Sequence, residues 1–252
     1  MTEPKARLRG LWTRIEGLRI YTRTSESPVP DRLPVVLIHG YGVSSRYMVP
    51  IASRLAAERP VYAPDLPGHG RSEAPERTLT VPELASVLYE WMDAAGLGRV
   101  ILLGNSMGCQ IAVELAVRHP ERIDRLILIG PTVDPEARTF RKQPLRFLRT
   151  AFAERPSLVF WVAWDYLRAG PRRILREMDV AFADRIEDKL GRVSAPSLVL
   201  RGERDAIVPQ RWAEAVARGL GAGPVEVLAG AGHALNYSAA DELMRRIRAF
   251  LP

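Results

Sequence analysis

Six short apolar runs recur along the 252-residue chain, and they constrain its fold more than any other feature. Most of them are rich in β-branched or leucine side chains and show no alternation with polar residues. Runs of this kind are typical of strands that are buried on both faces of a parallel sheet. The six runs occupy residues 35–38, 61–63, 100–103, 126–129, 198–200 and 225–228.

Segments with helical spacing separate these runs. Within 107–118, small and apolar side chains recur at the three- and four-residue intervals of one helix face. The alternation predicts an α/β fold, with a mostly parallel central sheet, helices on both faces and right-handed crossovers. Near the N-terminus, residues 8–15 and 18–24 flank a Glu-Gly turn and predict an antiparallel hairpin at the sheet edge. The other expected helices span 46–57, 81–95, 210–220 and 239–250.

The stretch 131–195 interrupts this alternation because it contains no strand-like run. Its pattern predicts helices, and we interpret it as a helical cap inserted between two strands of the core. Residues 1–130 and 196–252 would then form the core. Two ordinary crossover helices joined by a loop are the alternative. The expected cap helices are 145–153, 157–169 and 172–182.

Composition excludes several classes of protein. The formal net charge is +7, but acidic residues interleave with the basic ones, so a nucleic-acid partner is not expected. The longest wholly apolar stretch, 158–164, is too short for a membrane span, and residues 1–12 lack the apolar segment of a secretory signal. We therefore expect a cytoplasmic protein, monomeric or homodimeric, that acts on a small molecule.

Cofactor and metal chemistry find little support in the sequence. The single cysteine, Cys109, cannot form an internal disulfide or a cysteine-based metal site, and we expect it to be packed in the core. The four histidines show none of the spacings that bind a catalytic metal. We expect no cofactor and no metal.

The run at 100–103 leads directly into the sequence GNSMG at 104–108 and then into a predicted helix. This is the strand-turn-helix setting of a nucleophile elbow, in which a serine on a strained turn presents its hydroxyl. Glycines two residues to either side leave room for strand and helix to pass closely. We predict that Ser106 is a nucleophile and that the backbone N–H of Met107, at the helix start, stabilises an oxyanion.

A serine nucleophile needs a base, which a carboxylate must orient. In this architecture both follow the serine in the chain, each on a loop after a strand. Asp205 comes after the run at 198–200, and His233 comes after the run at 225–228. We predict these two residues as orienting acid and base. Glu203 is a nearby competing carboxylate, and His119 is expected only to cap a helix.

The second oxyanion donor should come from the loop after 35–38. Its backbone N–H would belong to Tyr41, or alternatively to Gly42, which we also expect near the substrate. His39 is expected to hold this loop. The turn-rich loop at 65–72 is interpreted as structural. Three cap aromatics, Phe160, Trp161 and Trp164, are candidates for the wall of a substrate pocket, or else for the cap's own core.

Taken together, these motifs resemble those of the α/β-hydrolase superfamily over nearly the whole chain. The resemblance implies a Ser106–His233–Asp205 triad with an oxyanion hole at Tyr41 and Met107. GNSMG is similar to the elbow of hydrolases that cleave carbon–carbon bonds of aromatic meta-cleavage products, and of many carboxylesterases. Ala234 stands where the former typically carry tryptophan, which favours the esterases. Relatives with an aspartate nucleophile are disfavoured by Ser106.

The sequence therefore predicts a serine hydrolase that cleaves carboxylic esters of small or medium, largely apolar acyl groups through an acyl-enzyme. The main alternative is a carbon–carbon, lactone or amide hydrolase that uses the same triad. A ligand sensor that keeps the fold without turnover is a further alternative, but no member of the triad is missing from the sequence.

Overall fold

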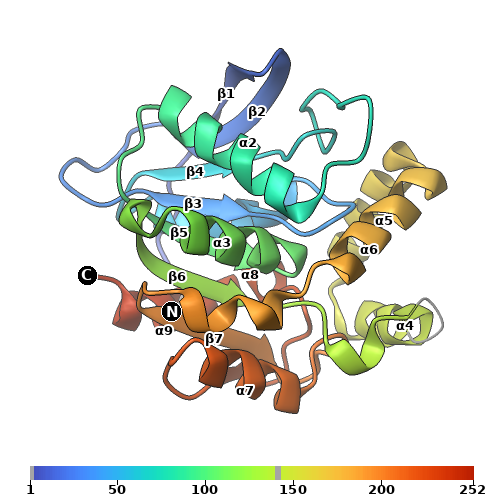
Figure 1. Cartoon of the computed structure of the whole chain (residues 1–252). Helices are drawn as coiled ribbons and strands as arrows, with labels where there is room; N and C mark the ends of the chain where they lie inside the picture. The colour runs from blue at the N-terminus through green and yellow to red at the C-terminus, as the bar shows by residue number, and fades with distance from the viewer. Residues whose placement is uncertain (1–2, 140–142) are drawn as a thin grey trace.

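Eight strands form one sheet in a computed structural model that describes residues 3–139 and 143–252 (Figure 1). Their order across the sheet is β1-β2-β4-β3-β5-β6-β7-β8, and β1 and β2 pair antiparallel at one edge. The remaining strands run parallel. The strands are β1 (Leu8–Ile15), β2 (Leu18–Ser25), β3 (Val35–Ile38), β4 (Val61–Pro64), β5 (Val100–Asn105), β6 (Ile123–Ile129), β7 (Ser197–Gly202) and β8 (Glu226–Leu228).

Helices cover both faces of the sheet, as the sequence predicts. One apolar cluster combines α2 (Val81–Ala94), α3 (Met107–Arg118) and α7 (Gln210–Gly219) with one face. A second cluster places α1 (Val49–Leu55) and α9 (Ala240–Phe250) on the other. Side chains of β3 alternate between the two clusters, because successive residues of a strand point to opposite faces. The strand is therefore buried on both sides.

One predicted helix is divided in two. The segment 46–57 forms a 3₁₀ turn at Ser45–Met48 followed by α1, with Pro50 in its first turn. A proline is tolerated there because the N–H that it lacks has no partner within the helix. The predicted helix 239–250 is present as α9, and a short helix, α8 (Leu235–Ser238), precedes it. Ala239 separates the two, because it leaves helical geometry at φ −127° and ψ 32°.

Three α-helices lie between β6 and β7 in the described residues, within the segment that we interpret as a cap. They are α4 (Gln143–Ala153), α5 (Pro156–Ala169) and α6 (Pro171–Ala183). No strand occurs in the described parts of 131–195, and residues 140–142 of the expected cap lie outside the described residues. The three helices lie together on one side of the molecule (Figure 1). No helix within the described residues is both long and apolar enough to cross a membrane.

The packing of α3 against the sheet depends on Gly108. A Cβ atom built at this position would lie 2.2 Å from the carbonyl oxygen of Ile38, at the end of β3. We expect Gly108→Ala to lower the free energy of unfolding by about 3 kcal/mol, because the added methyl collides with backbone and not with a flexible side chain. Denaturant unfolding measures the change.

Gly223→Ala is the matched control, since nothing lies within 4 Å of its built Cβ and its φ is not positive. It should change the stability by less than about 1 kcal/mol. Equal stability of the two variants would show that α3 does not need this close approach.

Candidate active site

Ser106 occupies the turn between β5 and α3 in a strained conformation. Its φ of 57° and ψ of −124° lie in a region that side-chain-bearing residues rarely adopt. The turn is tight: a Cβ built at Gly104 would lie 2.5 Å from the carbonyl oxygen of Gly108. A Cβ at Gly40, from the neighbouring loop, would lie 3.1 Å from the Cβ of Ser106. The serine is thus held between two close backbone segments.

Asp205 and His233 meet across two loops that follow β7 and β8. The Oδ2 atom of Asp205 lies 2.8 Å from the Nδ1 atom of His233. The other oxygen, Oδ1, accepts the backbone N–H groups of Ile207 at 2.9 Å and Val208 at 3.0 Å. Both side chains are buried. The carboxylate is therefore fixed by the backbone and presents one oxygen to the ring.

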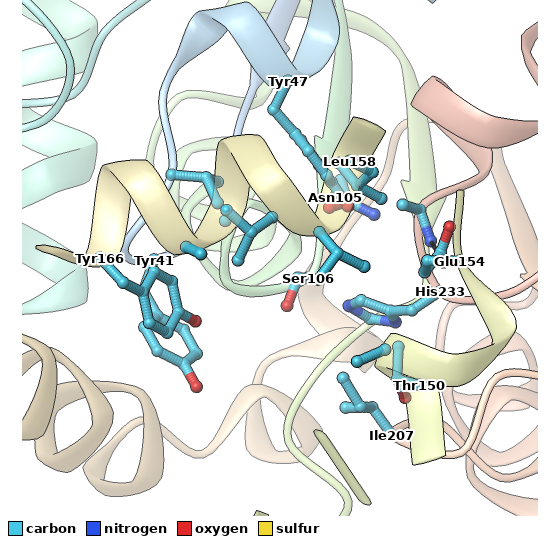
Figure 2. Close-up of a pocket in the computed structure, with 17 residues that line it drawn as sticks. Tyr41, Tyr47, Asn105, Ser106, Thr150, Glu154, Leu158, Tyr166, Ile207 and His233 are labelled. Atoms are coloured by element: carbon cyan, nitrogen blue, oxygen red, sulfur yellow. Dashed lines mark hydrogen bonds between the residues drawn. The ribbon is translucent and has the colours of Figure 1, made fainter. Parts of the chain in front are cut away.

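The hydroxyl of Ser106 and the ring of His233 face the same pocket (Figure 2). The buried Nε2 atom of His233 has no hydrogen-bond partner among the described residues. The structure thus brings all three predicted triad residues to one edge of the sheet. Glu203, the competing carboxylate, instead accepts the backbone N–H of Gly230 at 2.7 Å and is exposed.

The pKa of His233 is raised above its ordinary value. Burial by itself lowers this pKa, because it disfavours the charged ring. The charge of Asp205, its hydrogen bond and the charge of Glu154 together outweigh burial. The ring is thereby disposed to take up a proton.

Gly130, at the end of β6, supports this pair and was not singled out from the sequence. Its φ is +54°, and its N–H donates to the carbonyl of Leu200 at 2.8 Å. A Cβ built here would lie 2.9 Å from the ring of His233 and 3.2 Å from Oδ2 of Asp205. The only sequence signal was its position directly after a strand and before Pro131.

The expected oxyanion donors lie in the loop after β3 and at the start of α3. Tyr41 lines the pocket, and Met107 is the first residue of α3, so its N–H has no acceptor within that helix. Gly42, in contrast, does not line this pocket, and its N–H donates to Glu177 at 3.0 Å. Neither the substrate role of Gly42 nor its alternative role as oxyanion donor fits this arrangement.

His39 holds the loop, as predicted. Its Nδ1 atom lies 2.7 Å from the carbonyl oxygen of Gly40, and its Nε2 accepts the N–H of Leu66 at 3.0 Å. Burial lowers the pKa of His39 to about 4, so the ring stays neutral and keeps this acceptor. Asp65 is structural as well, since its carboxylate accepts the backbone N–H groups of Ser45 and Arg71.

The cap aromatics are a correction to the sequence prediction. Phe160, Trp161 and Trp164 do not line the pocket beside Ser106, and they are 61%, 36% and 46% exposed. They are not the buried core of the cap either. The opposite side of α5 faces the pocket, because these three positions fall on the outer half of the helix turn.

The pocket itself is a largely apolar cavity of about 240 Å³. Helix α5 contributes five side chains to its wall, and the loops of the core contribute most of the others (Figure 2). The lining residues are Gly40, Tyr41, Val43, Tyr47, Asn105, Ser106, Thr150, Ala151, Glu154, Leu158, Val159, Val162, Ala163, Tyr166, Ile207, His233 and Ala234. A largely apolar wall around the hydroxyl of Ser106 and the imidazole of His233 fits an uncharged, mostly hydrocarbon ligand.

Two cap carboxylates reach the loops of the site. Glu154, which follows α4, accepts the backbone N–H of Ala234 at 2.7 Å and the hydroxyl of Ser238 at 2.5 Å. Glu177, on α6, accepts the N–H of Gly42 and lies 3.1 Å from Nε2 of His69. The first contact holds the histidine loop and the second holds the oxyanion loop.

Cys109 is packed as expected and stands apart from this chemistry. It is fully buried on α3, and its Sγ contacts the carbonyl oxygens of Gly104 and Ile129. Burial raises the pKa of this thiol, which keeps it protonated and unreactive.

The parallel sheet, the strained serine turn and the buried histidine–aspartate pair together define the α/β hydrolases as a class. The chain belongs to the alpha/beta hydrolase family, whose model matches residues 35–246.

Relatives within this family differ in what their names describe. The chain is 35% identical to 1-acylglycerol-3-phosphate O-acyltransferase ABHD5 of Sus scrofa over 124 residues, covering 48% of this chain and 36% of that protein. It is 28% identical to pimeloyl-[acyl-carrier protein] methyl ester esterase of Neisseria meningitidis over 250 residues, covering 88% and 95%. The chain spans between a third and a half of the length of the first curated relatives that it matches.

Among solved structures, a thermophilic esterase from Thermogutta terrifontis in its malate-bound form is similar, with a TM-score of 0.78 and 26% identity. The match covers 97% of this chain and 98% of that one. An enol-lactonase from Burkholderia xenovorans LB400 has a TM-score of 0.80 at 22% identity and shares the fold.

Glu154→Gln should lower the pKa of His233, because the substitution removes a negative charge that stabilises the protonated ring while keeping an acceptor for Ala234. An NMR titration of the imidazole measures the midpoint directly. Glu203→Gln is the control, since it removes the same charge from an exposed side chain outside the pocket. Equal displacement of the midpoint in both variants would contradict a local effect of Glu154.

Glu177 should make stability depend on pH in the acid range. Burial raises the pKa of this carboxyl, but His69 and Arg173 outweigh burial and lower it to about 2, against 4.5 ordinarily. The ionised form therefore stabilises the fold above pH 4.5, and this contribution is lost as the pH falls toward 2. Glu177→Gln should flatten the dependence of unfolding free energy on pH across that range.

The matched control for this experiment is Glu26→Gln, at an exposed position. Denaturant midpoints at several acid pH values compare the two variants with the parent chain. A slope that stays unchanged in Glu177→Gln would contradict the ionised, paired state of Glu177.

Proposed function

We propose that the protein is a serine hydrolase that cleaves carboxylic esters of small or medium, largely apolar acyl groups. The observation that carries the proposal is the meeting of Ser106 and the unpartnered Nε2 of His233 in one apolar pocket. Asp205 holds the other side of the ring at 2.8 Å. The esterases among the relatives and solved structures support the same class of reaction.

In the proposed reaction, the Oγ atom of Ser106 attacks the ester carbonyl carbon while Nε2 of His233 takes the hydroxyl proton. The carbonyl oxygen gains the negative charge, and the N–H groups of Tyr41 and Met107 stabilise it. When the C–O bond to the alcohol breaks, His233 donates the proton to the leaving oxygen. A water molecule, deprotonated by the same ring, then attacks the acyl-enzyme and releases the acid and Ser106.

Asp205 supports both protonation states of the ring. Its Oδ2 accepts from Nδ1, which leaves Nε2 as the basic nitrogen that faces Ser106. When the ring is charged, the same oxygen stabilises the imidazolium. Since Oδ1 is already occupied by two backbone N–H groups, the carboxylate cannot rotate away without losing them.

The pocket wall indicates the acyl group. Leu158, Val162 and Ile207 offer aliphatic surface, and Glu154 is the one carboxylate in the lining. A substrate with a negative charge at this end of the pocket would be repelled, whereas a neutral hydrocarbon or aromatic chain would gain from burial. Neutral acyl esters are therefore the substrates that fit best.

Ser106→Ala should lower ester turnover by about 10⁴–10⁶-fold, because it removes the nucleophile while the rest of the site remains. The measurement is the hydrolysis rate of p-nitrophenyl esters of graded acyl length, with a lactone and an amide in the same panel. Mass spectrometry after treatment with an organophosphonate probe should place the adduct on the peptide that contains Ser106.

Cys109→Ser, one helical turn away, is the matched control, since its buried thiol has no part in the reaction. It should keep both the turnover and the phosphonate adduct. Full activity in Ser106→Ala, or a probe adduct on another peptide, would overturn the proposed nucleophile. A preference for the lactone or amide over every ester would overturn the substrate class.

A further inference from the structure

Helix α5 carries apolar side chains on two opposite faces. Its inner face lines the pocket, with Leu158 and Val162 among the residues there. Its outer face presents Phe160, Trp164 and Leu167, which follow one another at four- and three-residue intervals and are 61%, 46% and 79% exposed. A helix that is apolar all round is normally buried on every side. Here the core covers only the inner face, and we name Phe160, Trp164 and Leu167 the outer stripe.

Three acidic side chains of the cap accept hydrogen bonds from the loops of the core. Asp165, on α5 itself, accepts the hydroxyl of Ser44 at 2.9 Å. Glu154 and Glu177 accept backbone N–H groups of the core loops, as described above. The three carboxylates therefore place their negative charge on the underside of the cap.

The outer surface of the cap is left positively charged. Five arginines are exposed in the described parts of 143–183, whereas Asp179 is the one exposed carboxylate there. None of the five forms an ion pair with another residue that the structure describes. They are Arg149, Arg155, Arg168, Arg172 and Arg176. Arg155 precedes α5, and Arg168 and Arg172 follow the stripe, so positive charge lies at both of its ends.

We propose that the outer stripe and its flanking arginines dock the protein on an anionic lipid surface. Aromatic and aliphatic side chains enter the boundary between headgroups and acyl chains, while arginines bind the phosphates beside them. A second copy of this chain is a poor occupant, because a two-fold interface would place the arginines of one copy against those of the other. The positive charge of the surface thus favours an acidic partner. The exposed rings and leucine require that the same partner also offers apolar groups.

Docking in this orientation would place the pocket close to the lipid. The outer stripe and the wall of the cavity beside Ser106 are opposite faces of one helix, α5. A lipid-dissolved ester could then reach an apolar pocket without crossing much water. This consequence rests on the proposed function, whereas the docking itself does not.

Co-sedimentation of the full chain with vesicles tests the docking without any assay of activity. We expect binding to vesicles of phosphatidylcholine with added phosphatidylglycerol, and much weaker binding to phosphatidylcholine alone. Added salt should weaken the binding, because it screens the arginines.

Two variants separate the contributions of charge and apolar surface. Replacing Arg155, Arg168 and Arg172 together by glutamine should weaken binding on the order of 100-fold, at about fivefold for each arginine. Replacing Phe160 and Leu167 by serine should weaken it by at least about tenfold. Both variants should keep the parent rate on a water-soluble ester.

Matched controls use exposed residues at the far edge of the sheet. The first control replaces Arg7, Arg9 and Arg14 by glutamine, which removes the same charge from β1 and from the residue before it. The second replaces Leu11 and Trp12 by serine, which removes a comparable apolar surface. These controls should bind as the parent does. Failure of the parent to bind anionic vesicles, or equal loss in the variants and their controls, would overturn the proposal.

Light scattering of the lipid-free protein completes the test. The parent and the Phe160/Leu167 variant should have the same mass in solution. A dimer that dissociates in this variant would overturn the proposal, because the outer stripe would then be an interface between copies. Docking without esterase activity would instead refute the proposed function alone.

Discussion

The site depends on backbone segments that approach too closely for a side chain to fit between them. Gly108 presses α3 against the end of β3, since even one added carbon would lie 2.2 Å from a carbonyl oxygen. This brings the turn of Ser106 beside the loop after β3, where Gly40 allows a second close approach. Ser106, the proposed nucleophile, and the predicted oxyanion donors of Tyr41 and Met107 are neighbours for this reason. Steric exclusion between main chains, and not attraction between side chains, therefore sets the geometry of this half of the site.

The other half is set by hydrogen bonds between loops. Parallel strands end at one edge of the sheet, so the loops after β7 and β8 bring Asp205 and His233 together although they are far apart in sequence. Gly130 leaves room beneath them, and the backbone N–H groups that bind Oδ1 prevent the carboxylate from turning. The charge of Asp205, its hydrogen bond and the charge of Glu154 together more than offset the burial of the ring, which by itself lowers the pKa of His233. The pKa of His233 is therefore set jointly by the burial of the ring and by its pairing with Asp205.

The sequence predicted the features that depend on local pattern. Buried strands, the helix after Ser106 and the order of the triad motifs all follow from short-range spacing, and the structure matches them. The orientation of α5 could not be predicted in this way, because a helix that is apolar on both faces has no single periodicity to assign an inner side. The bulky aromatic side chains of α5 were expected in the pocket wall or in the core of the cap, but Trp164 lies on the exposed face of the helix. Glu154 and Glu177 were missed because their partners are backbone groups distant in sequence, which leave no local signal.

The cap carboxylates link the inside of the site to the outside of the protein. Glu154 holds the N–H of Ala234 and Glu177 holds the N–H of Gly42, so the cap cannot move away without leaving buried polar groups of both catalytic loops unpaired. Asp165 also ties α5 to the core, because its carboxylate accepts the hydroxyl of Ser44. Because all three negative charges are drawn inward, Asp179 is the one exposed carboxylate left against five exposed arginines in the described parts of 143–183. The arrangement that aligns the loops of the pocket is thus also the arrangement that makes the exposed face of the cap positive.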